Sequence, residues 1–328
     1  MITKIRVCLP TSNIPYENLA LEEYLMKTAR PGECIMSLWR NKRTVVIGRN
    51  QNARLECRAD DLTADGGHLA RRFSGGGAVF HDLGNLNFSF LVRDPDYDVD
   101  RQLSVIQLAL KRFGLNAEKT GRNDVAVDGR KCSGNAFLRE GAARCHHGTL
   151  LISVSSAHMV KYLTPDPAKL AAKGVKSVPS RVVNLHDICE ALTVETVIPA
   201  LIAAFEEVYG LKSDIIPLES LDWAAVNQRA AFLADPAWIF GKDPVYNLHS
   251  GRHRFGWGGA QLFLAEEEGK IRQAGLFTDA MDEGLSARVA AAMEGKNANE
   301  TALLTALSAA HLDAEIEADL AGLICEVF

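Results

Sequence analysis

Hydrophobic positions recur with the period of a helix in three segments of the chain. Tyr16–Thr28 places Leu21 and Leu25 one turn apart, with three glutamates near the start of the segment, where the helix dipole favours acids. Leu103–Phe113 and Glu195–Tyr209 carry apolar residues along one side only. These patterns predict three amphipathic helices.

Three further segments have the pattern of β-strands. Ile35–Trp39 and Arg43–Gly48 are rich in Val and Ile and flank Asn41 and Lys42, while Leu86–Val92 alternates apolar with small polar residues. Strands and helices are mixed without a regular alternation. The chain is therefore predicted to be an α+β protein, a mixed sheet with flanking helices, rather than a doubly wound fold.

A boundary is predicted near Asp235–Asn247, where Pro236, Gly241 and Pro244 follow a helical stretch. We expect a large domain at residues 1–243 and a small α/β accessory domain at residues 247–328. The short strands expected to open the accessory domain, before its helices, are His253–Trp257, Ala260–Leu264 and Ile271–Phe277.

Composition and charge disfavour several classes of protein. The chain has 328 residues, of which 47% are hydrophobic and 23% charged, enough to bury a sizeable core. A net charge of -5 disfavours nucleic acid as a partner. No stretch is apolar enough for a signal peptide or a membrane helix. We therefore expect a cytoplasmic protein with no nucleic-acid and no membrane partner.

The seven cysteines are scattered and contain no CxxC pair, which predicts reduced thiols rather than disulfides or a zinc site. Cys132 and Cys145 lie close to candidate catalytic residues, so a nucleophilic role has to be weighed. Free cysteine is more often a small buried residue, and no paired base is recognisable beside either one. We expect neither to be catalytic.

Residues 69–81, LARRFSGGGAVFH, set three consecutive glycines between two arginines and His81. Glycines let the backbone approach a ligand and present N–H groups to an anion, and neighbouring cations strengthen a phosphate or carboxylate pocket. The glycines alone would equally fit a β-turn. Their spacing fits neither a P-loop nor a dinucleotide-binding motif.

Residues 121–136, GRNDVAVDGRKCSGNA, predict a β-hairpin with a two-residue turn at Asp128-Gly129. The residues that such a turn sets opposite each other are Val127 and Arg130, Ala126 and Lys131, Val125 and Cys132, and Asp124 and Ser133. Asp124 and Lys131 then share one face with Ala126 and Ser133. They would form either a surface ion pair or part of a site.

These segments resemble, in order and spacing, the motifs of the lipoate-protein ligases. The matching segments are RRFSGGGAVFHDLGNLNFSF (71–90), GRNDVAVDGRKCSGNAF (121–137), HHGTLL (146–151) and KLAAKGVKSVPSRVVNL (169–185), with PYENLALEEYL (15–25) and LWRNKRTVVIGRNQNA (38–53), and more loosely FGWGGAQLFL (255–264) and AGLFTDAM (274–281). The resemblance implies a biotin and lipoate ligase-like catalytic domain at residues 1–243, which binds lipoate and ATP, followed by the accessory domain of the long members.

The resemblance implies an enzyme that activates lipoate with ATP to lipoyl-AMP and transfers the lipoyl group to a specific lysine of lipoyl-domain proteins. Expected acceptors are the E2 subunits of 2-oxoacid dehydrogenases and the glycine cleavage H protein. Expected cofactors are ATP and Mg²⁺.

Four alternatives remain. A lipoyltransferase would use preformed lipoyl-AMP, and a catalytically silent paralogue would only bind lipoate or a lipoyl domain. An octanoyltransferase of the same fold would, where it uses cysteine, carry one near residues 121–128, where none stands. A biotin ligase would carry a GRGRRG-like loop, which is absent.

Carried over residue by residue, the resemblance gives Lys131 the catalytic role and contacts with both ATP and lipoate. The other expected ATP-binding residues are Arg72, Gly77, Ala78, Val79 and Phe80. The other expected lipoate-binding residues are Ser74, Gly75, Gly76, His81, His147 and Gly148. Asp124 is a candidate ligand of Mg²⁺, and residues 171–183 match a loop that orders over the adenylate. The sequence departs from the family at Phe73, where a small residue is usual, and at Cys132, where an aliphatic residue is common.

Overall fold

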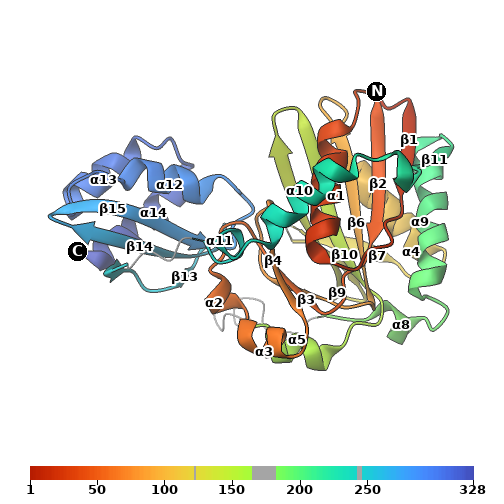
Figure 1. Cartoon of the computed structure of the whole chain (residues 1–328), viewed down its shortest axis with the longest axis horizontal. Helices are drawn as coiled ribbons and strands as arrows, with labels where there is room; N and C mark the ends of the chain where they lie inside the picture. Colours follow the sequence, from red (N-terminus) through yellow and green to blue (C-terminus); the bar gives the residue numbers. More distant parts are fainter. Residues whose placement is uncertain (122, 165–181, 242–245) are drawn as a thin grey trace.

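The computed structural model describes residues 1–121, 123–164, 182–241 and 246–328. Figure 1 shows two parts of unequal size, a large part that runs from the N-terminus to α11 and a small C-terminal part, drawn in blue. The predicted division between residues 243 and 247 adjoins residues 242–245, which lie outside the described residues, and it stays a prediction. No described helix is both long enough and apolar enough to cross a membrane.

An eight-stranded mixed sheet forms the centre of the large part, with the strand order β11-β1-β2-β6-β10-β9-β8-β7. The strands are β1 (Lys4–Cys8), β2 (Glu33–Trp39), β6 (Asn85–Arg93), β7 (Ala117–Thr120), β8 (Asp124–Val127), β9 (Arg130–Glu140), β10 (Ala143–Leu151) and β11 (Ser213–Ile215). β1 runs parallel to β2 and β11, and the other neighbours are antiparallel. Every residue of β2 is buried, because helices cover both faces of the sheet.

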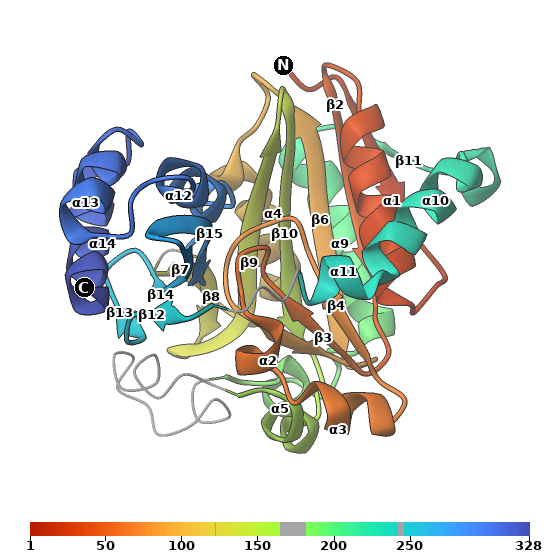
Figure 2. The same cartoon turned by 60° about the vertical axis from the view of Figure 1, so that its left-hand side comes forward.

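Each face of this sheet has its own pair of long helices (Figure 2). On one face α4 (Val99–Lys111) and α9 (Val194–Tyr209) share a core with Phe88 and Phe90 of the sheet. On the other face α1 (Pro15–Thr28) and α10 (Trp223–Ala234) share a core with Ile35 and Leu91.

A second sheet of three strands carries the glycine-rich segment. Its order is β4-β3-β5, with β3 (Thr44–Ile47) parallel to β4 (His68–Arg71) and antiparallel to β5 (Val79–His81). Residues 72–78 therefore cross from one side of β3 to the other. In the described residues of the large part, the short helices are α2 (Ala53–Glu56), α3 (Ala59–Ala64), α5 (Ser156–Tyr162), α8 (Leu185–Ile188) and α11 (Pro236–Ile239), with a 3₁₀ turn at Leu218–Ser220.

The C-terminal part has its own sheet and its own core. Its strands are β12 (Leu248–His249), β13 (His253–Arg254), β14 (Gly259–Glu267) and β15 (Lys270–Thr278), and its helices are α12 (Leu285–Met293), α13 (Glu300–Ser308) and α14 (Ala314–Val327). Leu262, Leu276 and Leu323 are among the residues of that core. Strands followed by helices are the order that the sequence predicts.

The predicted α+β class is confirmed, and most predicted elements differ from the observed ones only at their ends. α4 begins four residues before the predicted start, because Asp98 caps it by accepting a hydrogen bond from the Arg101 amide. The strand predicted at His253–Trp257 is wrong beyond Arg254, where Phe255 N donates to Gly258 O across a turn.

The predicted hairpin is correct at its turn and in its first two residue pairs. It is wrong in the next two pairs. Asp128 and Gly129 have φ of 50° and 73°, as a two-residue hairpin turn requires. Val127 lies opposite Arg130 and Ala126 opposite Lys131, as predicted, but Val125 faces Ser133 and Asp124 faces Gly134. Cys132 is the extra residue, a β-bulge that shifts the register, so Ser133 does not share the face of Lys131 as predicted.

Candidate active site

A pocket of about 610 Å³ lies where the main sheet, the small sheet and the C-terminal part meet. Its wall includes Trp39 of β2, Val79 of β5, Lys131 of β9 and Thr149 of β10, together with Trp257 of the C-terminal part. This volume is in the range of small-molecule sites.

Strand register shows how the pocket runs across the main sheet. Trp39 lies opposite Asn87 and Asn87 opposite Thr149, whose Oγ1 accepts a hydrogen bond from Gly134 N at 3.2 Å, and Gly134 lies opposite Asp124. All five residues line the pocket. At about 4.8 Å per strand, Trp39 and Gly134 are roughly 14 Å apart. The pocket thus runs from the Trp39 ring at β2 to the charged pair of Asp124 and Lys131 at β8 and β9.

The charged end holds an ion pair between Lys131 Nζ and Asp124 Oδ1, at 2.7 Å. The two side chains therefore lie together, as the hairpin turn predicts. Gly134 makes room for them, since a Cβ on this residue would lie 2.7 Å from Lys131 Nζ. Val182 forms a β-bridge with Lys131 and also lines the pocket.

The glycine loop, residues 74–77, is packed backbone against backbone. A Cβ on Gly75 would lie 2.4 Å from Ala280 O, and Gly76 N donates to the same oxygen at 2.9 Å. Gly76 has a φ of +86°, which side-chain-bearing residues rarely adopt. A Cβ on Gly48 would lie 2.1 Å from Gly76 O on the other side. The glycines therefore allow the loop to fit between residue 48 and residue 280.

The buried side chain of Arg72 stabilises this loop through hydrogen bonds. Its guanidinium donates to Ser74 Oγ at 3.0 Å, Gly75 O at 2.7 Å, Gly77 O at 2.9 Å and Val46 O at 3.2 Å. Burial lowers the pKa of Arg72 to about 10, so the group stays charged at neutral pH. Most of its donors are directed at the loop.

A chain of hydrogen bonds leads from Arg72 to a buried carboxylate. Ser74 Oγ accepts a hydrogen bond from Arg72 Nε at 3.0 Å and shares a second hydrogen bond with His147 Nε2 at 2.7 Å. His147 Nδ1 then donates to Glu22 at 2.9 Å. All four residues are buried. The Glu22 carboxylate thus places a proton on Nδ1 of His147.

The same carboxylate is linked to Trp39 at the β2 end of the pocket. Trp39 Nε1 donates to Ser89 Oγ at 3.0 Å, and Ser89 Oγ donates to Glu22. The indole and the His147 ring, which both line the pocket, are therefore held by one buried acid. Glu22, Cys145 and His147 are the group of three possible metal ligands found in the described residues, and Glu22 and His147 are already joined by hydrogen bonds.

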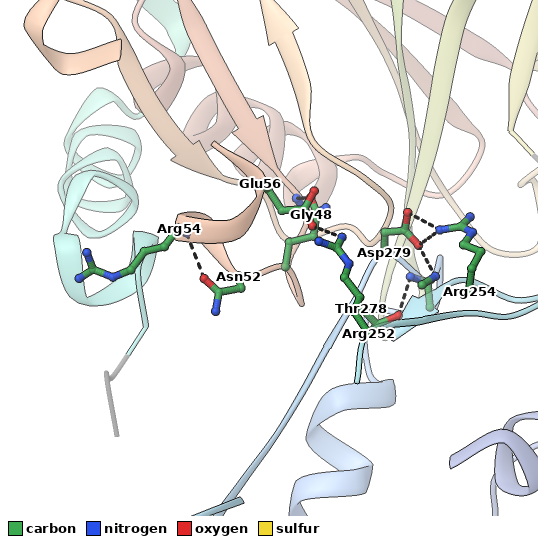
Figure 3. A network of polar contacts seen from close by, with 11 residues as sticks. Gly48, Asn52, Arg54, Glu56, Arg252, Arg254, Thr278 and Asp279 are labelled. Atoms are coloured by element: carbon green, nitrogen blue, oxygen red, sulfur yellow. Dashed lines mark hydrogen bonds and ion pairs between the residues drawn. The ribbon is translucent and has the colours of Figure 1, made fainter. Parts of the chain in front are cut away.

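Side chains and backbone of the C-terminal part close one side of the pocket. Arg254 pairs with Asp279 at 2.8 Å, and Arg252 pairs with Glu56 of α2 at 2.6 Å, which joins the two parts of the chain (Figure 3). Arg254, Asp279 and Glu56 all line the pocket.

Comparison with known proteins assigns the chain to a family. The model of the lipoyl protein ligase A/B catalytic domain matches residues 14–206. The chain belongs to the lipoyl protein ligase A/B family. A second model, bacterial lipoate protein ligase C-terminus, matches residues 244–324 of this ligase. Lipoate-protein ligase A of Psychrobacter cryohalolentis is 42% identical over 287 residues, which cover 85% of this chain and 84% of that protein.

Solved structures agree with this assignment. The structure of P. falciparum LipL1 in complex with lipoate is similar with a TM-score of 0.82 and 28% identity, over 97% of this chain and 98% of that one. A bi-partite lipoate protein ligase from Thermoplasma acidophilum, studied with its E2 lipoyl domain, has a TM-score of 0.64 and 27% identity, over 74% and 99%. A lipoate-protein ligase A bound with ATP has a TM-score of 0.63 and 25% identity, over 74% and 99%.

Most site residues expected from the resemblance gather around the pocket of this ligase. Those that line it are Arg72, Gly76, Gly77, Ala78, Val79, Phe80, His81, Asp124, Lys131, His147 and Gly148. Ser74 and Gly75 lie behind the wall, against His147 and Ala280. Of the loop expected at residues 171–183, residues 171–181 lie outside the described part.

The two departures from the family pattern have structural explanations. Phe73 turns away from the pocket and packs on Trp238, with ring centroids 4.8 Å apart, and under the Arg229 guanidinium at 4.6 Å. Cys132 is fully buried, and burial raises its pKa to about 12. Burial likewise raises the pKa of Cys145 well above its usual value. Neither thiol is poised to be a nucleophile.

Sequence reasoning missed Glu22, Trp39 and the pocket residues of the C-terminal part. Glu22 is one of three neighbouring glutamates on α1, and only the fold shows that it faces His147. The segments FGWGGAQLFL and AGLFTDAM were a usable signal, because their loose resemblance coincides with Phe255, Trp257, Asp279 and Met281 of the pocket wall.

Proposed function

We propose that this ligase activates lipoate with ATP and transfers it, through lipoyl-AMP, to a lysine of a lipoyl-domain protein. The observation that carries the proposal is the pocket itself, apolar at Trp39 and charged at Lys131 and Asp124. Its two ends lie three strands apart on one sheet face. That arrangement suits an acid with a long apolar tail, and two of the similar proteins named above were solved with lipoate and with ATP, respectively.

In the first half-reaction a carboxylate oxygen of lipoate attacks the α-phosphorus of ATP, and pyrophosphate leaves. The carboxylate and the triphosphate repel each other as they approach. A cation held between them stabilises the transition state more than the separated reactants. Lys131 has the right position, because it stands at the charged end of the pocket and is held there by Asp124.

Magnesium fits the same end of the pocket. Mg²⁺ keeps several waters and is usually held by one or two carboxylates together with substrate phosphates. Asp124 offers such a carboxylate on the pocket wall. An ion bound there would neutralise phosphate charge.

In the second half-reaction the amine of an acceptor lysine attacks the acyl carbon, and AMP leaves. The adenylate has to be protected from water until then. Residues 254–257, 279 and 281 line one side of the pocket and would keep water away from the adenylate. We propose lipoyl domains as acceptors, namely E2 subunits and the glycine cleavage H protein, and a cytoplasmic location, where ATP is available.

The test is the incubation of the full chain with lipoate, ATP, Mg²⁺ and an isolated lipoyl domain, followed by intact mass measurement of the domain. The expected result is the addition of one lipoyl group, which requires ATP and is absent when the acceptor lysine is replaced by Arg. Modification from lipoyl-AMP but not from lipoate and ATP would contradict the proposal and indicate a transferase.

A further inference from the structure

His146 of β10 lies behind the pocket wall rather than on it. Its side chain is fully buried, its ring contacts those of Phe88, Phe90 and Phe137, and it does not line the pocket. Burial lowers the pKa of His146 to about 3, so the ring is neutral at physiological pH. A neutral imidazole has one donor and one acceptor, and a buried polar group is costly unless it is paired. The partners of this ring therefore show what it holds in place.

The amide of Asn135 on β9 identifies the donor of the ring. Asn135 Nδ2 donates to Asn123 O at 3.1 Å, which leaves Asn135 Oδ1 to face His146 Nε2 at 2.9 Å. The proton is therefore on Nε2. On the other side of the ring, Gln102 Oε1 of α4 lies 3.0 Å from Nδ1, and Gln102 Nε2 has no partner in the described residues. A half-turn of the Gln102 amide places its N–H at Nδ1 and pairs both groups.

The glycine at position 148 makes room for the bond between Asn135 and His146. Asn135 lies opposite Gly148, which follows His146 by two residues on β10. A Cβ on Gly148 would lie 2.7 Å from Asn135 Oδ1, so a side chain at this position would force the amide of Asn135 to move. Gly148 thus allows His146 to reach diagonally from β10 to β9.

Asn135 carries this support to the charged end of the pocket. Asn123 O accepts hydrogen bonds from Asn135 N at 2.7 Å and from Asn135 Nδ2, and Asn123 Nδ2 donates to Asn135 O at 2.8 Å. Asn123 lines the pocket and directly precedes Asp124, which pairs with Lys131. The outer neighbour of β8 is β7, which is largely exposed and offers little burial. Residues 123 and 124 are therefore anchored to the interior through Asn135 and His146.

We propose that His146 is a positioning residue of the reaction: through Asn135 it fixes Asn123 and Asp124 at the end of the pocket that takes Mg²⁺ and the phosphates of ATP. The inference rests on the proposed function. A residue that only supports the core would change the fraction of folded enzyme and leave both KM values as they are. His146 should instead change the binding of MgATP, because the tail of lipoate would lie toward Trp39, three strands away.

The test is lipoate-dependent ATP–pyrophosphate exchange by the wild type, His146→Leu and His146→Gln, with the KM for MgATP and the KM for lipoate measured separately. His146→Leu removes the donor and should raise the KM for MgATP on the order of tenfold, the scale of one buried hydrogen bond, with the KM for lipoate within about twofold of wild type. Glutamine can place an N–H near the position of Nε2, so His146→Gln should stay within about threefold of wild type for MgATP.

Two further variants control the measurement. His186→Leu changes a half-buried histidine that does not line the pocket, and it should leave both KM values unchanged. Asn135→Ala should raise the KM for MgATP as His146→Leu does, and the double variant should show no further rise, because the two side chains act through one hydrogen bond. If His146→Leu does not fold, Asn135→Ala decides alone.

The inference is overturned if His146→Leu keeps both KM values and loses only kcat, or if it raises both KM values equally. An unchanged KM for MgATP in Asn135→Ala, or an additive rise in the double variant, also overturns it. These results leave the proposed ligase activity intact. Failure of that activity appears instead as no lipoate-dependent exchange by the wild type.

Discussion

At the scale of single residues, the buried carboxylate of Glu22 organises the inner wall of the pocket. It accepts hydrogen bonds from His147 Nδ1 and from Ser89 Oγ, and through them it is linked to the glycine loop and to Trp39. Because both partners are donors, the position requires an acceptor that has no hydrogen of its own.

Glu22→Gln should therefore lower the free energy of unfolding by about 1–3 kcal/mol, since its amide sets a donor against a donor in a buried place. Urea unfolding followed by circular dichroism measures the change. Glu190→Gln, at an exposed position, should stay within about 0.5 kcal/mol of wild type. If the stability of Glu22→Gln is unchanged, the hydrogen bonds of Glu22 do not stabilise the inner wall of the pocket.

Replacing Cys132 and Cys145 by Ser should leave ligation within several-fold of wild type. Burial raises the pKa of both thiols, so neither provides a thiolate near neutral pH. Ligation rates of the two single variants, with thermal melts to confirm folding, measure the effect. Loss of activity in a folded variant would make that cysteine a catalytic group.

The sequence predicts that Lys131 and Asp124 lie together, but it does not predict that Glu22 contacts His147. The difference has a physical reason. A two-residue turn brings the lysine and the aspartate together locally, so their ion pair follows from the hairpin. Glu22 meets His147 across 125 positions of the chain. Helical periodicity shows that α1 has a buried side but not which strand residue lies opposite it.

At the scale of elements, the glycine loop connects the three-stranded sheet with the C-terminal part. Gly76 packs against Gly48 on one side, and Gly75 and Gly76 contact the backbone at residues 280–281 on the other. A substitution at Gly75 acts on this packing, whereas one at Gly76 also acts on the pocket wall.

Gly76→Val should impair use of both lipoate and ATP while the fold is kept, because a branched side chain would be strained at a φ of +86° and would contact Arg72 and Met281. Gly75→Ala should impair ligation as well, since its Cβ would clash with Ala280 O. Kinetics and ligand binding by calorimetry measure the effects. Gly322→Ala, with open space around its Cβ, is the control. If Gly76→Val binds both ligands normally, the loop is only a turn.

The hairpin shows which feature of an element could not be predicted from the sequence, namely the shift in its register. Turn chemistry at Asp128-Gly129 sets the first two residue pairs, and both are observed. The bulge at Cys132 then shifts the register, and nothing in the alternation of side chains marks it. Cys132 still reaches the core beside Val125.

At the scale of the whole molecule, the pocket belongs to two parts with separate cores. The core around Leu262 and Leu323 contains only residues of the C-terminal part. Yet Phe255, Trp257 and Met281 of this part line the pocket of the larger one. Periodicity predicts each core from its own segment, but the contact between the two parts depends on surfaces that no local pattern describes.

The central claim is that the pocket forms lipoyl-AMP and that Lys131 is required for this step. Exchange of labelled pyrophosphate into ATP, dependent on lipoate, reports the step without an acceptor protein. The wild type should support exchange. Lys131→Ala should raise the activation free energy of exchange by at least about 3 kcal/mol, which is the scale of losing one preorganised donor. Circular dichroism should show the variant folded. Near-wild-type exchange by Lys131→Ala, or no exchange by the wild type, would contradict the claim.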